Sequence, residues 1–257
     1  MEQSAEMTPE EKAIEEAAFQ FAKVHRARLA RDIADTKVFP SEVSPLTVFM
    51  AGSPGAGKTE ISKAMVDILE QGTVSVEAKK ILRIDPDDFR CLIPGYSGRK
   101  SYLYQRAVTK ILERVLDRVF EKRISFLLDG TLANLDVAKR NINRVLASQR
   151  IAQIIYVYQE PRLAWQFVQA REITEGRNIP LEAFVAQYLA ARRNVIELRR
   201  YYDKQFFVDL IIKNTDGTAS LFEGDVSVER IDALVPQTYD QFELVELLTG
   251  VQSHERS

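Results

Sequence analysis

The segment Phe49–Met65, with the sequence FMAGSPGAGKTEISKAM, decides the fold of this chain. It contains the end of an apolar run, a glycine-rich turn that finishes in Gly-Lys-Thr, and the start of an amphipathic stretch. Residues 52–59 match the pattern G-x-x-x-x-G-K-[ST] in full. Because a phosphate-binding loop of this type lies between a strand and a helix, the segment predicts a nucleotide triphosphate site.

Each residue type in this loop has a physical task. The glycines allow backbone angles and close approaches that a side chain would prevent, so that successive N–H groups converge on a phosphate. We expect Lys58 to reach the β- and γ-phosphates and the Thr59 hydroxyl to ligate Mg²⁺. The predicted cofactors are therefore ATP and Mg²⁺. The predicted nucleotide-binding residues are Gly52, Ser53, Pro54, Gly55, Ala56, Gly57, Lys58, Thr59 and Glu60.

Apolar runs alternate with amphipathic stretches along the rest of the chain. Strands are expected from Leu46, Ile81, Ile124, Ala152 and Phe206, with a short one near 220–224. Helices are expected over about 58–69, 101–122, 135–147, 161–174, 181–204 and 239–248. Strands joined by helices form right-handed crossovers and a parallel sheet. The predicted fold class is therefore α/β, a P-loop NTPase/kinase fold with a mostly parallel sheet flanked by helices.

The composition excludes several classes of protein. The chain has 257 residues, of which 46% are hydrophobic and 28% charged, as in ordinary globular proteins. A net charge of −2 argues against a surface that binds nucleic acid everywhere. The single cysteine, Cys91, excludes an internal disulfide framework and fits a reducing compartment. With no signal-peptide pattern and no apolar run near the roughly 20 residues of a membrane span, we expect a cytoplasmic protein.

An acidic residue is needed at the end of a neighbouring strand to orient Mg²⁺ or its waters. The run ISFLLDGT, residues 124–131, places Asp129 at that point. The alternative is a turn or cap residue before the next helix. We favour the metal role because an apolar run followed by an acid matches the expected topology.

The class of P-loop protein is narrowed by the motifs that are missing from the chain and by those that are present besides the phosphate loop. No Asn-Lys-x-Asp type guanine loop follows a late strand, and motor and AAA-type ATPases need more chain around the nucleotide. A small-molecule kinase remains, and such an enzyme needs a proton acceptor for its substrate. The segment RIDPDDFRCLIP offers Asp85, Asp87 and Asp88 at the carboxyl end of a strand, where α/β sheets bind ligands. A helix-cap cluster is the alternative reading.

Kinases of this kind also close arginines over the phosphates. The segment REITEGRNIP carries Arg171 and Arg177 at the end of one predicted helix and in the turn before the next. Planar guanidinium groups there would stabilise the charge of a transferred phosphoryl group. Alone, the segment reads as a solvated charged turn, but its place after the other motifs favours a lid.

These motifs, in this order, resemble the zeta toxin family of bacterial toxin–antitoxin systems, P-loop kinases related in fold to adenylate kinase-type enzymes. The likeness runs from about Thr47 to Asn214 through GSPGAGKT, IDPDDFR, DGT, and an arginine followed by GRNIP. Characterised members phosphorylate the 3′-hydroxyl of the amino sugar in UDP-N-acetylglucosamine. The resemblance therefore implies a sugar-nucleotide acceptor and an antitoxin protein as partner.

The resemblance also implies roles for individual residues. Lys58 corresponds to the P-loop lysine, and Asp87 to the base that faces the sugar hydroxyl. Thr131 falls on the threonine of the family's strand-end EGT. The implied catalytic residues are Asp87, Lys58, Arg171 and Arg177; the implied substrate-binding residues are Asp85, Asp87, Thr131 and Asn134; the implied metal ligands are Thr59 and Asp129.

Two departures from the family concern the acceptor. The strand-end acid is Asp129 where the family usually has Glu, which is one methylene longer, so contact through water becomes an alternative. No arginine directly follows Thr131, and Asn134 stands nearby instead. Contacts to the sugar nucleotide are therefore expected to differ, and another acceptor such as NAD is the alternative.

The chain divides into an N-terminal helical extension, 1–44, and a P-loop kinase domain, 45–257, with a helical lid at about 160–204. The extension begins with a capping pattern at Thr8–Glu11 and forms a helix to about Ile33. Packing on the helices that flank the sheet is the simpler role for it. The second role, by analogy with the family's helical antitoxin, is to block the nucleotide site in cis.

Two further functions compete with the kinase. A nucleotide-binding regulator would need the loop but neither Asp87 nor the lid arginines. A kinase for nucleic-acid ends would use a basic strip made of Arg192, Arg193, Arg199 and Arg200. Those arginines are spaced as on one solvated helix face, which is the simpler explanation.

Overall fold

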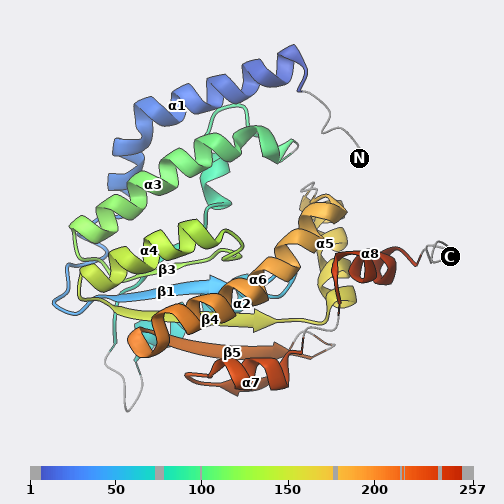
Figure 1. The fold of residues 1–257 in the computed structure, drawn as a ribbon. Coiled ribbons are helices and arrows are strands. Elements are labelled where there is room, and N and C mark those ends of the chain that lie inside the picture. The colour runs from blue at the N-terminus through green and yellow to red at the C-terminus, as the bar shows by residue number, and fades with distance from the viewer. Residues whose placement is uncertain are drawn as a thin grey trace.

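The computed structural model describes residues 7–72, 78–98, 100–175, 179–214, 216, 218–236 and 239–250 (Figure 1). Its strands are β1 (Leu46–Ala51), β2 (Leu82–Ile84), β3 (Phe126–Leu128), β4 (Ile151–Tyr158), β5 (Phe207–Lys213) and β6 (Ala219–Glu223). Its α-helices are α1 (Pro9–Ile33), α2 (Lys58–Gln71), α3 (Gln105–Glu121), α4 (Leu135–Ala147), α5 (Pro161–Glu175), α6 (Leu181–Tyr202), α7 (Val228–Leu234) and α8 (Gln241–Thr249). Short 3₁₀ turns are η1 (Asp88–Leu92), η2 (Ser101–Tyr104) and η3 (Asp203–Gln205).

The strands form a six-stranded sheet of order β2-β3-β1-β4-β5-β6. All neighbouring strands are parallel except β5 and β6, so the predicted mostly parallel α/β sheet is confirmed. Strand β1, which leads into the glycine-rich loop, lies between β3 and β4, with Thr47 opposite both Phe126 and Ala152. The carboxyl ends of the parallel strands therefore meet on one edge, where ligands of such sheets bind.

The two faces of the sheet are covered unequally. Because side chains alternate along a strand, Phe49 and Ala51 of β1 point to one face, and Val48 and Met50 to the other. The first face packs against α3, α4 and α6 in the larger hydrophobic cluster. The apolar side chains packed on the second face, among the described residues, come from α2. The helix that follows the glycine-rich loop is thus also the cover of that face.

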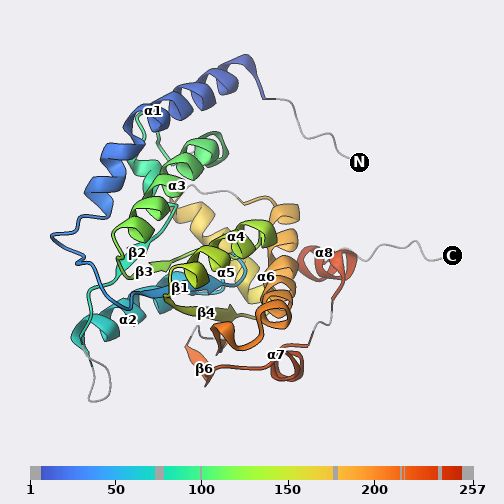
Figure 2. The same cartoon turned by 60° about the vertical axis from the view of Figure 1, so that its left-hand side comes forward.

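Helix α1 lies on the outer side of α3, as both views show (Figures 1 and 2). It begins with the capping box predicted at Thr8 and Glu11, and it ends at Ile33 as expected. Its buried residues are Ala18, Ala22, Leu29 and Ala30, which belong to the same cluster as the sheet. Packing on a flanking helix, the simpler of the two roles considered for this segment, is therefore what the structure contains.

Helix α7 is absent from the sequence-based assignment. It has 7 residues, of which Val228 and Ile231 are buried, and so few apolar positions give no visible helical period. The helix predicted from Ser101 likewise begins as the 3₁₀ turn η2, and α3 starts only at Gln105. Both differences concern short elements whose geometry depends on the core that they contact.

Phe126, at the start of β3, is the residue whose substitution tests the packing of this core. Phe126 is fully buried and packs edge-on against Phe49 and Phe120, with ring centroids 6.2 and 5.7 Å away. Phe126→Ala should lower the free energy of unfolding by about 3–5 kcal/mol, measured by denaturant titration, because it removes the ring and leaves a cavity. Phe222→Ala is the matched control. Phe222 is 61% exposed, and its loss should change stability by no more than about 0.5 kcal/mol.

Candidate active site

The glycine-rich loop between β1 and α2 has backbone geometry that requires glycine. Gly52, Gly55 and Gly57 all have positive φ, at 143°, 73° and 83°. A Cβ on Gly55 would lie 2.1 Å from the carbonyl oxygen of Ala164, and one on Gly52 would lie 2.4 Å from that of Val157. The loop is therefore packed against the start of α5 and the end of β4, with no room for side chains at these positions.

This loop forms one wall of a cleft of about 1070 Å³ at the carboxyl edge of the sheet. Residues 54–60 line it, so the first turn of α2, the end of a helix where backbone N–H groups point outward, opens onto the cleft. Lys58 lines it too, and its Nζ donates to the carbonyl oxygen of Ser53 at 2.6 Å. Gly52 and Ser53 contribute no lining surface. The loop predicted to bind phosphate therefore borders a cavity, to which Pro54 to Glu60 contribute surface.

A second lysine lies beside the loop. Lys213, the last residue of β5, lines the cleft, and its Cε lies 3.2 Å from the position that a Cβ on Gly57 would take. The strand order β1-β4-β5 brings this residue to the start of α2. Sequence reasoning missed Lys213 because nothing near it in the chain resembles a phosphate-binding motif.

The guanidinium of Arg83, in β2, connects the acidic residues of the cleft. Its Nη2 donates to Asp129 at 2.5 Å and to Asp85 at 2.7 Å, and its Nε donates to Ser62 at 2.8 Å. Ser62, in α2, donates in turn to Asp129 at 2.8 Å. The ends of β2 and β3 are thereby bound to α2 through one cation. Burial raises the pKa of Asp85, whereas the bond from Arg83 acts in the opposite direction.

Asp87 lies in the same wall but has a different partner. Its carboxylate is 36% exposed to solvent and accepts from Nη1 of Arg90, three residues later. The other end of that guanidinium, Nη2, donates to Gln105 at 2.8 Å, and Arg90 itself is buried. The backbone N–H of Asp87 donates to Asp85 at 3.0 Å. Asp85 thus holds the turn, and Asp87 is the more exposed of these two acids that line the cleft.

The predicted substrate residues after β3 separate in space. Thr131 lines the cleft, and its carbonyl oxygen accepts from the N–H of Gly52 at 3.3 Å. Asn134 is the N-cap of α4, where its side chain accepts from the N–H of Val137 at 3.0 Å. It is not among the residues that line the cleft. The structure therefore brings Thr131 to the site, and gives Asn134 a structural role.

The two helices predicted to form a lid, α5 and α6, border the cleft. Arg171, Phe167 and Thr174 of α5 line it, so one of the two predicted lid arginines lies at the cleft. Arg177 lies outside the described residues. The lid helices share a small hydrophobic cluster with α8, centred on Phe184, Val185 and Leu244. Helix α5 and the first part of α6 are thus packed with α8, whereas the second part of α6 packs on the sheet.

The oxygens next to the loop fit a magnesium ion held mainly by phosphates. Within the described residues, no three His, Cys, Asp or Glu side chains form a metal cluster. Mg²⁺ in nucleotide sites takes few protein ligands, because phosphate oxygens and water supply the rest. Thr59 and Asp129 both line the cleft, and Asp129 uses a single oxygen, Oδ2, for its bonds to Ser62 and Arg83. These two residues suit a bound Mg²⁺ that the Thr59 hydroxyl would contact directly and Asp129 through a water molecule.

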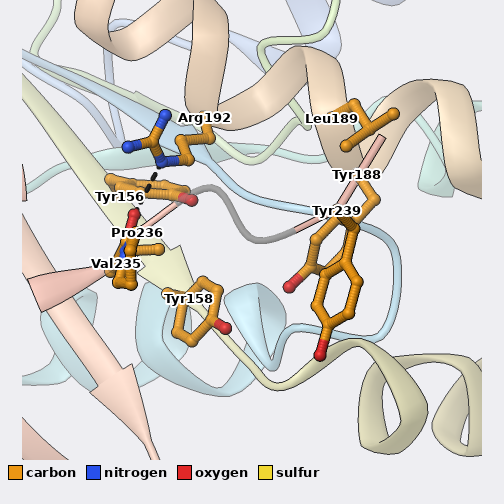
Figure 3. Close-up of a pocket in the computed structure, with 8 residues that line it drawn as sticks. All are labelled: Tyr156, Tyr158, Tyr188, Leu189, Arg192, Val235, Pro236 and Tyr239. Carbon is orange, nitrogen blue, oxygen red and sulfur yellow. Dashed lines mark hydrogen bonds between the residues drawn. The ribbon is translucent and has the colours of Figure 1, made fainter. Parts of the chain in front are cut away.

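A smaller cavity lies between the end of β4, α6 and the segment that follows α7 (Figure 3). Its volume is about 20 Å³, and it is lined by Tyr156, Tyr158, Tyr188, Leu189, Arg192, Val235, Pro236 and Tyr239. The Tyr188 hydroxyl donates to the carbonyl oxygen of Gln159 at 3.2 Å, and Gln159 lines the large cleft. Burial raises the pKa of Tyr156, so its phenol stays neutral. The volume suffices for about one water molecule and not for a substrate.

The arginines of α6 do not form a continuous basic strip. Arg199 is 7% exposed, donates to the carbonyl oxygen of Phe206 at 2.8 Å, and pairs with Asp225 at 2.9 Å. Arg192 donates to the carbonyl oxygen of Val235 at 2.7 Å. Both side chains are used inside the protein, which leaves little of the strip that a nucleic-acid end would need. In the part of the chain that the structure describes, no helix is both long and apolar enough to cross a membrane.

Comparison with known proteins agrees with this site. The family described as Zeta toxin matches residues 30–227. The toxin PezT of Streptococcus pneumoniae serotype 4 is 26% identical over 145 residues, which are 53% of this chain and 54% of that protein. The match therefore spans about half the length of that relative.

Two solved structures share the fold. One comes from the characterisation of the PezAT chromosomal toxin–antitoxin system of Streptococcus pneumoniae. It has a TM-score of 0.62 and 20% identity, covering 94% of this chain and 95% of that chain. The other is AvrRxo1-ORF1:-ORF2 with ATP. It has a TM-score of 0.59 and 15% identity, covering 97% of this chain and 76% of that chain. Since the family match covers well over half of the residues and agrees with the loop, the sheet and the cleft, the chain belongs to the zeta toxin family.

Proposed function

We propose that this protein is an ATP-dependent kinase that transfers the γ-phosphoryl group to a hydroxyl of a sugar nucleotide. The proposed acceptor is the 3′-hydroxyl of the amino sugar of UDP-N-acetylglucosamine. One observation carries the proposal: a single cleft is lined both by the phosphate loop with Lys58 and by the acidic turn with Asp87. Its volume of about 1070 Å³ leaves room for a nucleotide and a second substrate of similar size.

The arrangement suits in-line transfer between two bound substrates. Phosphoryl transfer passes through a loose transition state, so positioning and charge neutralisation supply most of the rate. Lys58 and the N–H groups at the start of α2 would hold the β- and γ-phosphates, and Arg171 would approach them from the lid. Asp87 would orient the acceptor hydroxyl and take its proton. Bound Mg²⁺ would neutralise phosphate charge, with Thr59 and Asp129 as its protein-side groups.

A protein antitoxin is proposed as the partner of this chain. The structural neighbours support it, because one comes from a toxin–antitoxin system and the other is a complex of two open-reading-frame products. No residue of α1 lines the cleft, which favours a separate partner over inhibition in cis by this helix.

The function is tested by incubating the protein with Mg-ATP and a panel of UDP-sugars, free nucleotides and NAD. We expect UDP-N-acetylglucosamine to gain the mass of one phosphate. If NAD alone gained the mass of one phosphate, the protein would still be a kinase, but its acceptor would be NAD. ATP binding with no product on any acceptor would favour a nucleotide-binding regulator instead.

Nucleotide binding should depend on the packing of the loop. Gly55→Ala should abolish ATP binding in isothermal titration calorimetry, because the new Cβ would collide with the Ala164 carbonyl and displace the loop. Gly224→Ala is the control, since its Cβ would meet its nearest atom, in Asp209, at an ordinary 3.7 Å. Normal ATP affinity in the Gly55 variant would show that the loop does not hold the nucleotide.

The loop lysine should be needed for transfer. Lys58→Ala should reduce the rate by at least about 10²-fold, because a charge that stabilises the transferring group is lost. Lys63→Ala removes an exposed lysine from the same helix and should leave the rate unchanged. Both rates come from a product assay by mass spectrometry, and an unaltered rate for Lys58→Ala would refute the site.

The two acids of the turn should respond differently. Asp87→Asn should keep ATP affinity and reduce phosphorylation by roughly 10²–10⁴-fold, as for removal of a general base. Asp85→Asn should instead lower the unfolding midpoint, because Asp85 binds Arg83 and the N–H of Asp87. If Asp85→Asn were stable and inactive while Asp87→Asn stayed active, the base would be Asp85.

A further inference from the structure

Helix α1 is attached to the protein in two ways along its length. Its buried residues begin at Ala18 and form an apolar contact with α3. Nearer its start, Met7 and Ile14 pack partly buried against the same cluster, and the polar contacts of the first turn centre on one residue, Glu11. The polar contacts of the first turn can therefore be removed by mutation while the apolar contacts stay.

Both oxygens of Glu11 are used. Oε2 accepts from the N–H of Thr8 at 2.9 Å, which completes the capping box. Oε1 accepts from the hydroxyl of Tyr102 at 2.6 Å and lies 3.0 Å from Nζ of Lys100. The bond from Tyr102, with those from Thr8 and Lys100, holds the pKa of Glu11 at about 2. The carboxylate is consequently ionised at any pH at which an enzyme of this kind works.

Tyr102 connects this contact to the cleft. It belongs to η2, whose next two residues are buried, whereas Tyr102 itself is 55% exposed and lines the cleft. Directly after η2 comes Gln105, which accepts from Arg90, the partner of Asp87. Tyr102 therefore lies on the hydrogen-bonded wall that carries the proposed base.

A half-exposed tyrosine on a short 3₁₀ turn would otherwise be free to change rotamer. A side chain fixed before binding loses less entropy when a ligand arrives. The ring also offers an apolar face to a sugar or base ring. A hydrogen bond that fixes the Tyr102 hydroxyl therefore raises the affinity for a ligand that contacts the ring.

We propose that Glu11 is a positioning residue for the acceptor, which fixes the Tyr102 ring in the cleft beside Asp87. The first turn of α1 then helps to set acceptor affinity although it touches no substrate. This inference rests on the proposed kinase function and deepens it, since it assigns part of the acceptor site to the N-terminal helix.

The test measures steady-state kinetics with UDP-N-acetylglucosamine, or with whichever panel member the wild-type protein phosphorylates. Glu11→Ala should raise the acceptor KM about twofold to tenfold and leave kcat and the KM for ATP unchanged. Tyr102→Phe should give a similar rise, which keeps the test valid if Glu11→Ala does not fold. Adding Glu11→Ala to Tyr102→Phe should change nothing further, because the bond is already absent.

Two control variants separate this role from simple attachment of the helix. Glu16→Ala removes another contact between α1 and α3, the 3.1 Å pair with Arg106, which does not line the cleft. Thr8→Ala removes the reciprocal half of the capping box. Both should keep the wild-type acceptor KM.

Four results would overturn the inference. They are an unchanged acceptor KM in Glu11→Ala, an equal rise in either control, additive effects with Tyr102→Phe, and a rise in the KM for ATP of the same size. If the wild-type protein binds ATP but phosphorylates no acceptor, the proposed function fails, and this role of Glu11 fails with it. An active wild type with an unchanged Glu11→Ala variant removes only the role of Glu11.

Discussion

The cleft depends on the guanidinium of Arg83, which joins the ends of two strands and a helix. Asp85 and Asp129 face each other at the carboxyl edge of the sheet with little solvent between them. Two carboxylates in such surroundings repel each other, and burial favours their neutral forms. A cation bonded to both offsets this repulsion and holds them in place, and its bond to Ser62 ties them to α2. The acidic half of the site is thus built around an internal counter-ion before any substrate arrives.

The parts of the site that can be predicted from the sequence are those whose structure depends only on neighbouring residues in the chain. The loop of Gly52 to Thr59, the strand before it and the helix after it form one continuous segment whose chemistry is written in its own residues. Asp129 was expected at a strand end and lies there, because an apolar run that stops at an acid marks the edge of a sheet. The capping box at Thr8 is local in the same sense.

The missed residues owe their position to contacts between distant segments. Arg83 is the one charged residue of the run ILRI, and its partners become visible only when Leu82 pairs with Phe126. Lys213 reaches the loop because β4 lies between β1 and β5. Asn134 shows the reverse case. A polar residue after a family motif suggests a ligand contact, but local backbone geometry makes it the cap of α4.

Because one helix, α2, both follows the phosphate loop and covers the second face of the sheet, nucleotide binding is coupled to the stability of the protein. The loop that faces the phosphates continues without a break into α2, whose Ile61, Met65, Val66 and Leu69 cover the second face. A ligand that orders the first turn of this helix also secures the cover over the second face of the sheet. Nucleotide bound to the folded protein then raises its free energy of unfolding. The protein should therefore resist heat and proteolysis better when nucleotide is abundant.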